Sequence, residues 1–356
     1  MNEPKTEKTP WDAVDRLIDA MSVDQVVEHG LGPLAARRWH ARGRQLPVQL
    51  AREERAAKAS NLVAPALLAR IRDAVDGPLV LFKGPELSRR YPGRARRFGD
   101  LDLLPEDAEQ AQAALLAAGF RLQDRDWPPA GYHAERRPHY HLHPLEWPGV
   151  ALRVEIHKTV KWPDGVRPPS NESIFRDAMP APGVDGLLVP DRAQHAVLLA
   201  SHAWGEIAFR RLRQLVDIVA FLEDGIEANL LEEAAAAWGF RRGWLSSVEV
   251  CRWMFYGEEK PTSVRIWARH LETLRDPRVF EMHVQAWLAP FWMVAPPKAA
   301  QLAVAALTHD FRPEIGQTWG DKLRQTARAL RHPFSSKSEH TKRSGARWWQ
   351  KPRNGA

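Results

Sequence analysis

One stretch, residues 79–104, most constrains what this chain can fold into. A short apolar run leads to Lys83 and Gly84, an arginine-rich connection follows, and the sequence Asp-Leu-Asp-Leu-Leu begins at Asp100. Side chains two residues apart on a β-strand point to the same face, so Asp100 and Asp102 should project together while the leucines enter a core. Two neighbouring carboxylates repel each other unless a cation lies between them. The stretch therefore predicts a strand that presents a cation-binding pair of carboxylates.

The two aspartates are of the kind that binds magnesium. Carboxylates are hard oxygen ligands, and proteins commonly hold Mg²⁺ through one or two of them together with substrate phosphates. We therefore expect metal-assisted phosphate chemistry at Asp100 and Asp102. The structural alternative is that Asp-x-Asp is common at strand edges, and either aspartate could cap the helix predicted to begin near Pro105.

Three segments together resemble a known family. The first is the apolar strand with Lys-Gly, a short helix with Tyr-Pro, an arginine and Asp-Leu-Asp-Leu-Leu. The second, residues 152–157, reads Leu-Arg-Val-Glu-Ile-His, and the third is the helical stretch 195–222 with His202. Over about residues 76–225 the chain is similar to the uncharacterised nucleotidyltransferase family of the DNA polymerase β-like superfamily.

The resemblance implies nucleotidyl transfer assisted by Mg²⁺ or Mn²⁺, with three carboxylates on adjacent strands as ligands. We expect these to be Asp100, Asp102 and Glu155, with Glu155 also helping to deprotonate the acceptor. The alternative for Glu155 is a surface carboxylate that pairs with Arg153 on the same strand face. His157 shares that face and could orient Glu155 or contact the acceptor.

The turn after the first strand departs from the superfamily pattern, which usually has Gly-Ser or Gly-Gly where this chain has Gly84-Pro85. Backbone N–H groups at the start of a helix favour a phosphate, and Pro85 removes one such donor. Lys83 and Gly84 are thus expected to bind the nucleotide, with Lys83 carrying more of the phosphate contact. The alternative is that Lys83 only extends from the end of a buried strand to reach solvent.

Arginines beside the aspartates are candidates for binding the triphosphate. Arg96 matches the family's position best and could neutralise the phosphates through its planar guanidinium, and Arg97 is the next candidate. The other arginines of the connection are expected to form a solvated basic face. Further along, Arg213 and Asp217 lie four residues apart and predict a helix-surface ion pair or a contact between domains.

Histidines near the second segment raise the question of a zinc site. His139, His141 and His143 alternate and would share one strand face, and neutral imidazole suits zinc. Histidines on a sheet face beside a phosphate site often contact substrate or only form hydrogen bonds. We therefore favour a magnesium or manganese site and not a zinc site.

Hydrophobic periodicity predicts helices on both sides of a small sheet. Strands that alternate with helices indicate a mixed sheet, so we expect an α+β fold with a polymerase β-like nucleotidyltransferase core between N-terminal and C-terminal helical regions. The segment from Arg167 to Pro190 is rich in Pro, Gly and Asp and is predicted to be a linker. The expected divisions are an N-terminal helical region at 1–75, the α/β core at 76–185, a helical region at 186–333 and a disordered basic tail at 334–356.

The composition favours an anionic partner. The 356 residues carry a net charge of +7 and are 44% hydrophobic, and no apolar run is long enough to span a bilayer. The first ten residues lack the apolar stretch of a secretory signal, and the single Cys251 excludes an internal disulfide. We therefore expect a cytoplasmic protein with no membrane partner, whose anionic partners are nucleotides or nucleic acid.

The predicted reaction is attack by an acceptor hydroxyl or phosphate on the α-phosphate of an NTP, with release of pyrophosphate. Neither the NTP nor the acceptor, which could be a small molecule, a peptide or a protein, is specified by the sequence. Three alternatives stay open: another phosphotransfer at the same site, a non-catalytic protein, and a nucleic-acid-binding module. Nucleic acid is the less favoured partner, and the fold alone does not decide among these functions.

Overall fold

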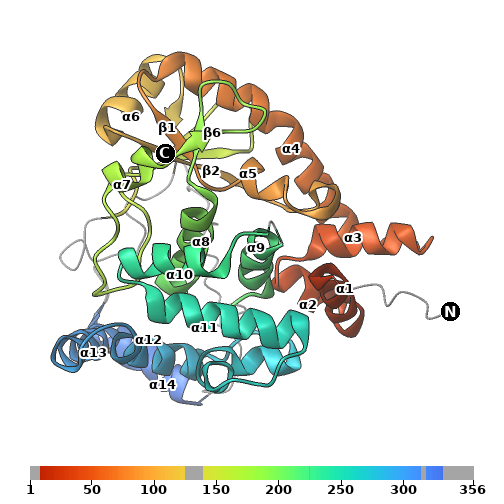
Figure 1. Ribbon diagram of the computed structural model, residues 1–356. Coiled ribbons are helices and arrows are strands. Elements are labelled where there is room, and N and C mark those ends of the chain that lie inside the picture. The colour runs from red at the N-terminus through yellow and green to blue at the C-terminus, as the bar shows by residue number, and fades with distance from the viewer. Residues whose placement is uncertain (1–8, 125–138, 224, 314–317, 332–356) are drawn as a thin grey trace.

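A mixed β-sheet occupies one part of the molecule, and layers of helices occupy the other (Figure 1). This computed structural model describes residues 9–124, 139–223, 225–313 and 318–331. Within these ranges the sheet has seven strands, and helical regions precede and follow it. The predicted α+β fold is confirmed. The predicted tail at 334–356 lies outside the described residues.

Strand β2 is at the centre of the sheet, whose order is β3-β4-β5-β2-β1-β7-β6. It pairs parallel to β5 and antiparallel to β1, and β1 in turn pairs parallel to β7. Strands β4 and β5 pair antiparallel and form a hairpin. The strands are β1 Leu79–Leu81, β2 Asp100–Pro105, β3 Arg121–Leu122, β4 Leu145–Glu146, β5 Arg153–Ile156, β6 Met179–Pro180 and β7 Leu188–Val189.

Six α-helices lie within the described residues 9–118 of the chain. Capping side chains fix the starts of two of them. Ser22 accepts a hydrogen bond from the backbone of Gln25 at the start of α2, and Asp107 caps α6 in the same way. The long helix α4 carries its apolar residues at helical spacing and packs them onto the sheet. These helices are α1 Pro10–Ala20, α2 Val23–Glu28, α3 Gly32–Ala41, α4 Val48–Ala74, α5 Pro85–Ser88 and α6 Ala108–Ala117.

The C-terminal part is helical, as predicted. Asp191 accepts hydrogen bonds from the backbone of Ala193 and Gln194 and so caps α8. No helix within the described ranges has both the length and the apolar character needed to cross a membrane. The helices are α7 Asn171–Arg176, α8 Arg192–Glu206, α9 Leu212–Leu222, α10 Ala228–Ala237, α11 Arg241–Cys251, α12 Val279–Met293, α13 Pro296–Phe311 and α14 Trp319–Arg331.

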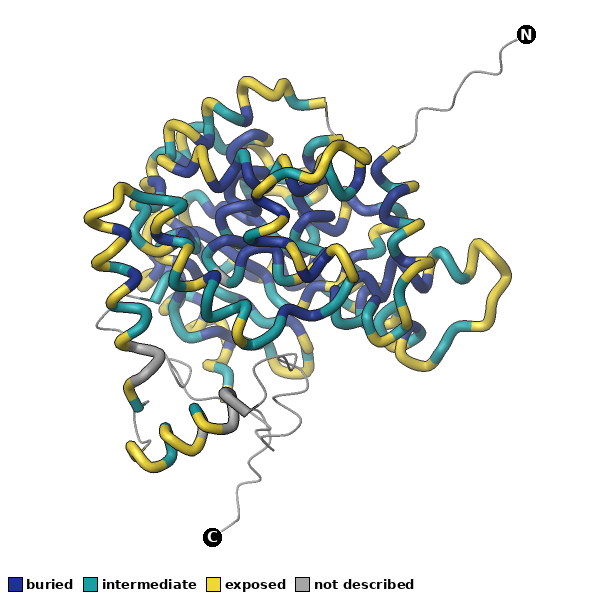
Figure 2. The backbone as a smooth tube through the Cα atoms, turned by 90° about the horizontal axis from the view of Figure 1, so that it is seen from below, coloured by how far each residue is buried: buried dark blue, intermediate teal, exposed yellow. Residues whose placement is uncertain are grey.

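The two faces of the sheet belong to two separate cores. Leu101 and Leu103 of β2 point toward α4 and α6, where they pack with apolar residues of those helices. Leu104 points to the opposite face, together with Val80, and joins a second core built from the N-terminal helices and α8–α11. Figure 2 shows the buried segments gathered toward the middle of the molecule, with most of the exposed ones around them. Alternate residues of one strand therefore enter different environments.

The prediction that the segment from Arg167 to Pro190 is a linker is wrong. This segment contains α7 and the strands β6 and β7, and β7 extends the sheet beside β1 through the pairing of Leu188 with Val80. Two-residue strands bounded by Pro and Gly carry too little periodicity to be distinguished from a loop. The sheet consequently continues past residue 185, where the core was predicted to end.

Candidate active site

Asp102 and Glu155 lie side by side on neighbouring strands. Because β2 and β5 run parallel, their register pairs Asp102 with Glu155 and Asp100 with Arg153. Adjacent strands are about 4.8 Å apart, so these side chains project from the same face at close range. This is the face directed toward the C-terminal helices, since Leu101 and Leu103 enter the core on the other side. The sequence predicted the common face of the two aspartates, and the register adds Glu155 beside Asp102.

Asp102 is buried, and its two oxygens have different surroundings. Oδ1 lies 3.1 Å from Nε2 of His157 and 3.6 Å from Nζ of Lys83. Oδ2 has no hydrogen-bond partner within the described part of the chain. Burial acts to raise the pKa of Asp102, but Lys83 and the hydrogen bond to His157 outweigh it and hold the pKa below its usual range. Asp102 is therefore a carboxylate with one oxygen available for a further ligand.

The surroundings of Glu155 raise its pKa, whereas those of Asp102 lower the pKa of that residue. Burial, followed by the nearby charges of Asp102 and Asp100, raises its pKa to about 7. Nε2 of His141 lies 3.5 Å from one of its oxygens, and the bridge between His141 and His157 places this histidine beside the end of β5. Burial and then His157 lower the pKa of His141 to about 3, so its imidazole is neutral near pH 7.

The residues present fit a divalent cation. Asp102, Glu155 and His157 each offer a ligating atom, and these atoms all lie within 4.8 Å of one another. The unpartnered oxygen of Asp102 and the raised pKa of Glu155 both indicate negative charge that lacks full compensation. A cation between the two carboxylates would relieve their repulsion. Carboxylate oxygens with one imidazole nitrogen form a ligand set found around divalent metals.

Asp100 lies beside this cluster and has another partner. Nη2 of Arg153 donates a hydrogen bond of 3.0 Å to its Oδ2, and each side chain is about one-third exposed. The sequence had offered Arg153 as an alternative partner for Glu155, but the register places it opposite Asp100. Of the three carboxylates predicted as ligands, the structure brings Asp102 and Glu155 together and leaves Asp100 at the margin.

Gly84 brings the turn after β1 against the start of β2. Its φ is +72°, a conformation that favours glycine, and a Cβ built there would lie 3.1 Å from the carbonyl oxygen of Asp100. Pro85 follows as the first residue of the four-residue helix α5. Close approach of the two backbones is what places Lys83 next to Asp102.

Arg96 and Arg97 were predicted to bind phosphate, and the structure gives each a carboxylate partner. The guanidinium of Arg96 is buried and donates hydrogen bonds of 2.7 and 3.0 Å to Asp217 of α9. The Tyr91 hydroxyl donates a third, of 2.6 Å, to the same carboxylate. Arg97, half exposed, lies 2.5 Å from Glu53. Asp217 thus joins α9 to the connection before β2, 121 residues earlier in the chain.

Histidines other than His157 occupy different positions around the site. His141 reaches Glu155, whereas Nε2 of His143 lies 2.9 Å from the carbonyl of Gln123, away from the carboxylates. His202 of α8, which resembled an ordinary core histidine, lies near enough for its charge to lower the pKa of Asp102. Sequence reasoning missed the proximity of His141 and His202 because both depend on how distant segments pack.

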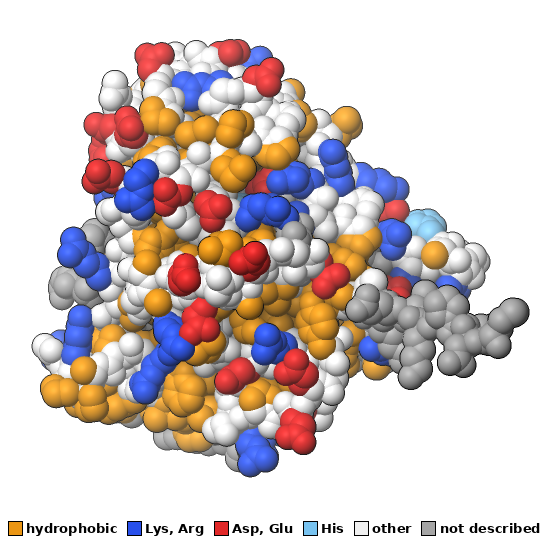
Figure 3. Space-filling model, in the orientation of Figure 1, with side chains coloured by type: hydrophobic (Ala, Val, Ile, Leu, Met, Phe, Trp, Pro, Cys, Tyr) orange, Lys and Arg blue, Asp and Glu red, His pale blue; other side chains and the backbone are white. Residues whose placement is uncertain are grey.

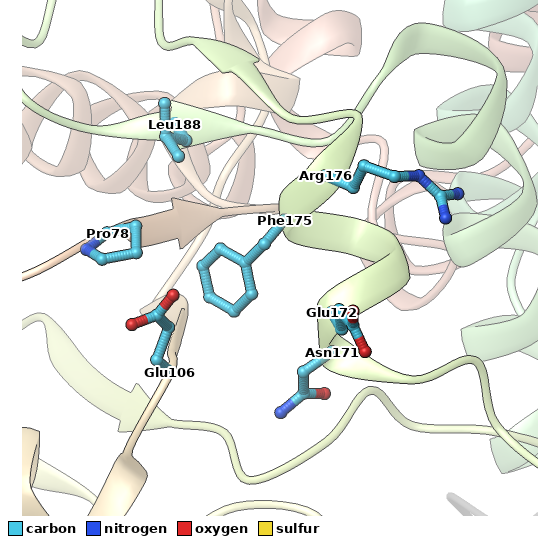
Figure 4. Close-up of a pocket in the computed structure, with 7 residues that line it drawn as sticks. All are labelled: Pro78, Glu106, Asn171, Glu172, Phe175, Arg176 and Leu188. Carbon is cyan, nitrogen blue, oxygen red and sulfur yellow. The ribbon is translucent and has the colours of Figure 1, made fainter.

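A pocket of about 430 Å³ lies at the other end of the sheet (Figure 4). Pro78 precedes β1 and Glu106 follows β2, and because these strands are antiparallel, both residues lie opposite the end that carries Lys83 and Asp100. Phe175 and Arg176 of α7 line the same pocket. The residues around it include none of the clustered carboxylates, so this pocket is separate from the Asp102 cluster.

Comparison with known proteins gives one match. No curated protein and no solved structure matches the chain. A model of an uncharacterised nucleotidyltransferase family matches residues 15–256, which is more than half of the chain and includes the second half of α1, the whole sheet and α2 to α11. The family implied by the sequence resemblance is thereby confirmed. The chain belongs to this uncharacterised nucleotidyltransferase family.

Proposed function

We propose that the protein transfers a nucleoside monophosphate from an NTP to an acceptor and releases pyrophosphate. The observation that carries this proposal is the pairing of Asp102 with Glu155 in register on one face of the sheet, with one oxygen of Asp102 lacking a partner among the described residues. Family membership supports the reaction class. The acceptor is a small molecule, peptide or protein with a free hydroxyl or phosphate.

Asp102 and Glu155 would hold a divalent cation, Mg²⁺ or Mn²⁺, with Asp100 at its margin. When bound, such a cation stabilises negative charge on the reacting phosphate and on the leaving pyrophosphate. Its positive charge would also lower the pKa of Glu155, which burial and the neighbouring aspartates raise to about 7. The chain's own contribution is to hold two carboxylates close together in a buried place.

Glu155 is the group that we propose accepts a proton from the acceptor. As the acceptor oxygen bonds to the α-phosphorus, the bond from that phosphorus to the bridging oxygen of pyrophosphate breaks, and the acceptor proton moves to a Glu155 oxygen. A cation beside Glu155 would keep its carboxylate ionised at the working pH and therefore able to accept this proton. His141, neutral and 3.5 Å from Glu155, would orient the carboxylate.

Lys83 and Gly84 would contact the phosphates of the NTP, since they lie at the same end of the sheet as Asp102. Arg97 is half exposed and could move from Glu53 to a phosphate. Arg96 could do so only by giving up its buried ion pair with Asp217, which is costly, so we propose that it positions the connection before β2.

Nucleic-acid binding through a basic surface receives less support. Residues 319–356 contain ten Lys and Arg against two Asp and Glu, a net charge of +8, so residues 1–318 together carry −1. Figure 3 shows Lys and Arg interspersed with Asp and Glu on the face it presents. The basic pI therefore originates at the C-terminal end and not around the carboxylates. Nucleic acid bound there would dissociate steeply with salt and would be insensitive to Asp102.

Nucleotide binding and turnover test the proposal directly. We would measure calorimetric binding of ATP, GTP, CTP and UTP with Mg²⁺ or Mn²⁺, and the release of pyrophosphate, for the wild type and Asp102→Asn. Glu106→Gln, an exposed acid at the opposite end of β2, is the matched control. We expect one metal-dependent NTP complex that is lost only in Asp102→Asn. A folded wild type that binds no NTP, or that releases NDP instead of pyrophosphate, would contradict nucleotidyl transfer.

A further inference from the structure

We propose that His157 is a nitrogen ligand of the site's cation, and that the site consequently selects Mn²⁺ over Mg²⁺. The inference rests on the proposed function, because it concerns the cation of the same site. The family resemblance implies three carboxylate ligands, Asp100, Asp102 and Glu155. The structure instead brings the imidazole of His157 to Asp102 and Glu155, while Asp100 pairs with Arg153.

The imidazole of His157 is fixed beside the carboxylates. Its backbone N–H donates a hydrogen bond of 2.8 Å to the carbonyl of Leu103, which continues the pairing of β5 with β2. The side chain is 1% exposed, and the ring of Phe82 meets it edge-on with centroids 4.9 Å apart. A ring held in this way cannot turn away from Asp102. It is already in the position that a metal ligand would require.

Both nitrogens of this ring fit a role as a ligand. Nε2 lies 3.1 Å from Oδ1 of Asp102, a contact that a shared cation could replace. Nδ1 is buried and has no hydrogen-bond partner within the described residues, as is also true of Oδ2 of Asp102. A buried carboxylate oxygen without a partner, directly beside this imidazole, indicates that something else binds there.

The composition of the ligand set decides which metal binds better. Mg²⁺ prefers six oxygen ligands and retains several waters, so an imidazole contributes little to its binding. Imidazole nitrogen instead favours transition metals, and Mn²⁺ accepts carboxylate oxygens as well. A set of two carboxylates and one imidazole should therefore bind Mn²⁺ at least about tenfold more tightly than Mg²⁺.

A competing role for His157 is to donate a hydrogen bond to Asp102 and orient it without touching the metal. Outer partners of this kind also affect metal affinity, so loss of affinity in a variant does not separate the two roles. Direct contact does separate them, because a nitrogen bonded to Mn²⁺ couples magnetically to the electron spin of the metal. The experiment must therefore detect the nitrogen itself.

The test uses the full chain with Mn²⁺ alone, free of nucleotide. Pulsed electron paramagnetic resonance on the wild type should show coupling to ¹⁴N, and growth with ¹⁵N-labelled histidine should change it. His157→Gln should remove the coupling and reduce the preference for Mn²⁺ over Mg²⁺ measured by calorimetry. His143→Gln is the control, because its imidazole contacts the Gln123 carbonyl and not the carboxylates. His141→Gln should retain the coupling.

The outcomes are distinguishable. Histidine nitrogen coupling that persists in His141→Gln and is lost in His157→Gln supports the inference. No coupling in the wild type, or equal affinity for the two metals, overturns it, and this result does not require any variant to fold. If Mn²⁺ binds through His157 but no NTP is consumed with either metal, the proposed function fails while the assignment of the ligand stands.

Discussion

The two faces of the central strands have different compositions, although alternate residues of the same short segments form both. Leu101 and Leu103 enter an all-apolar core beneath α4 and α6, whereas Asp102, between them, lies with Glu155 and His157 on the opposite face. The apolar face contributes stability through burial. The other face holds charges that are costly to bury unless they are paired. The comparison indicates that the clustered carboxylates are confined to one face of β2, where they lie beside the second apolar core that includes Leu104.

Substitution of neighbours on the two faces should separate these roles most clearly. Leu103→Ala should lower the free energy of unfolding by about 2–5 kcal/mol, because it leaves a cavity in a fully buried core. Asp102→Asn should change stability less and reduce kcat/KM by at least about 10²-fold. Urea unfolding and NTP turnover measured on both variants check the contrast. Equal loss of stability in the two variants would mean that the faces are not functionally distinct.

The pH dependence of stability should contain a contribution from the charged face, which the buried histidines oppose because burial lowers their pKa values. In the metal-free protein Glu155 has a pKa raised from 4.5 to about 7, so the folded state binds its proton more tightly than the unfolded state does. The resulting stabilisation, on the order of 3 kcal/mol, is complete below pH 4.5 and is lost as the pH rises through about 7. Urea unfolding in EDTA between pH 4 and 8 measures it.

Glu155→Gln tests the origin of this pH dependence, because its amide does not titrate. Between pH 4.5 and 7 the stability of the wild type relative to Glu155→Gln should fall by this amount, whereas Glu106→Gln should follow the wild type. Binding of Mn²⁺ to the wild type should also tighten as the pH rises through 7, because the Glu155 proton must leave. An unchanged slope in Glu155→Gln would assign the pH dependence to another group.

The turn at Gly84 links the charged face to β1, and its substitution should have an intermediate effect. Gly84→Ala should cost about 1–3 kcal/mol of stability, because an alanine is strained at φ +72° and its Cβ meets the Asp100 carbonyl at 3.1 Å. Gly77→Ala is a matched control, since Gly77 has φ +77° but no atom within 4 Å of such a Cβ. Thermal unfolding of both variants isolates the steric contribution, and an equal loss would argue against close backbone contact.

The smallest effect is expected at the exposed margin of the charged face. Arg153→Gln removes the ion pair with Asp100, in which each side chain is about one-third exposed, so stability should change by less than about 1 kcal/mol. Calorimetric metal affinity should change little for the same reason. A large loss of affinity would show that Asp100, held by Arg153, belongs to the ligand set after all.

The sequence predicted local features of the site well and long-range contacts poorly. Alternation along 100–104 is sufficient to place Asp100 and Asp102 on one face, because the period of a strand is fixed by its backbone geometry. The partner of Arg96 could not be predicted in this way, since Asp217 lies 121 residues further on and reaches it only through the packing of α9. The same holds for His141, which adjoins Glu155 through an isolated bridge to His157.

Short strands were the second reason why predictions from the sequence differed from the structure. Strands β6 and β7 have two residues each, so neither could show the alternation that identified β2. Their place in the sheet depends on hydrogen bonds to β1 and to each other, which are contacts formed by the tertiary structure. The segment from 167 to 190 therefore had the composition of a linker although it completes one side of the sheet.

The core shared by the N-terminal and C-terminal helices has a consequence for how the chain folds during synthesis. Its buried residues extend from Ala13 to Leu271. Two side chains, Gln25 of α2 and His29 at the C-cap of α2, form hydrogen bonds with the carbonyl of Leu274. Contacts across such a sequence distance form late, because a long loop must close first. The part of the first helices that contacts residues near Leu274 is therefore left uncovered until about 250 further residues have been translated. Their exposure over that interval makes the nascent chain a natural client for chaperones.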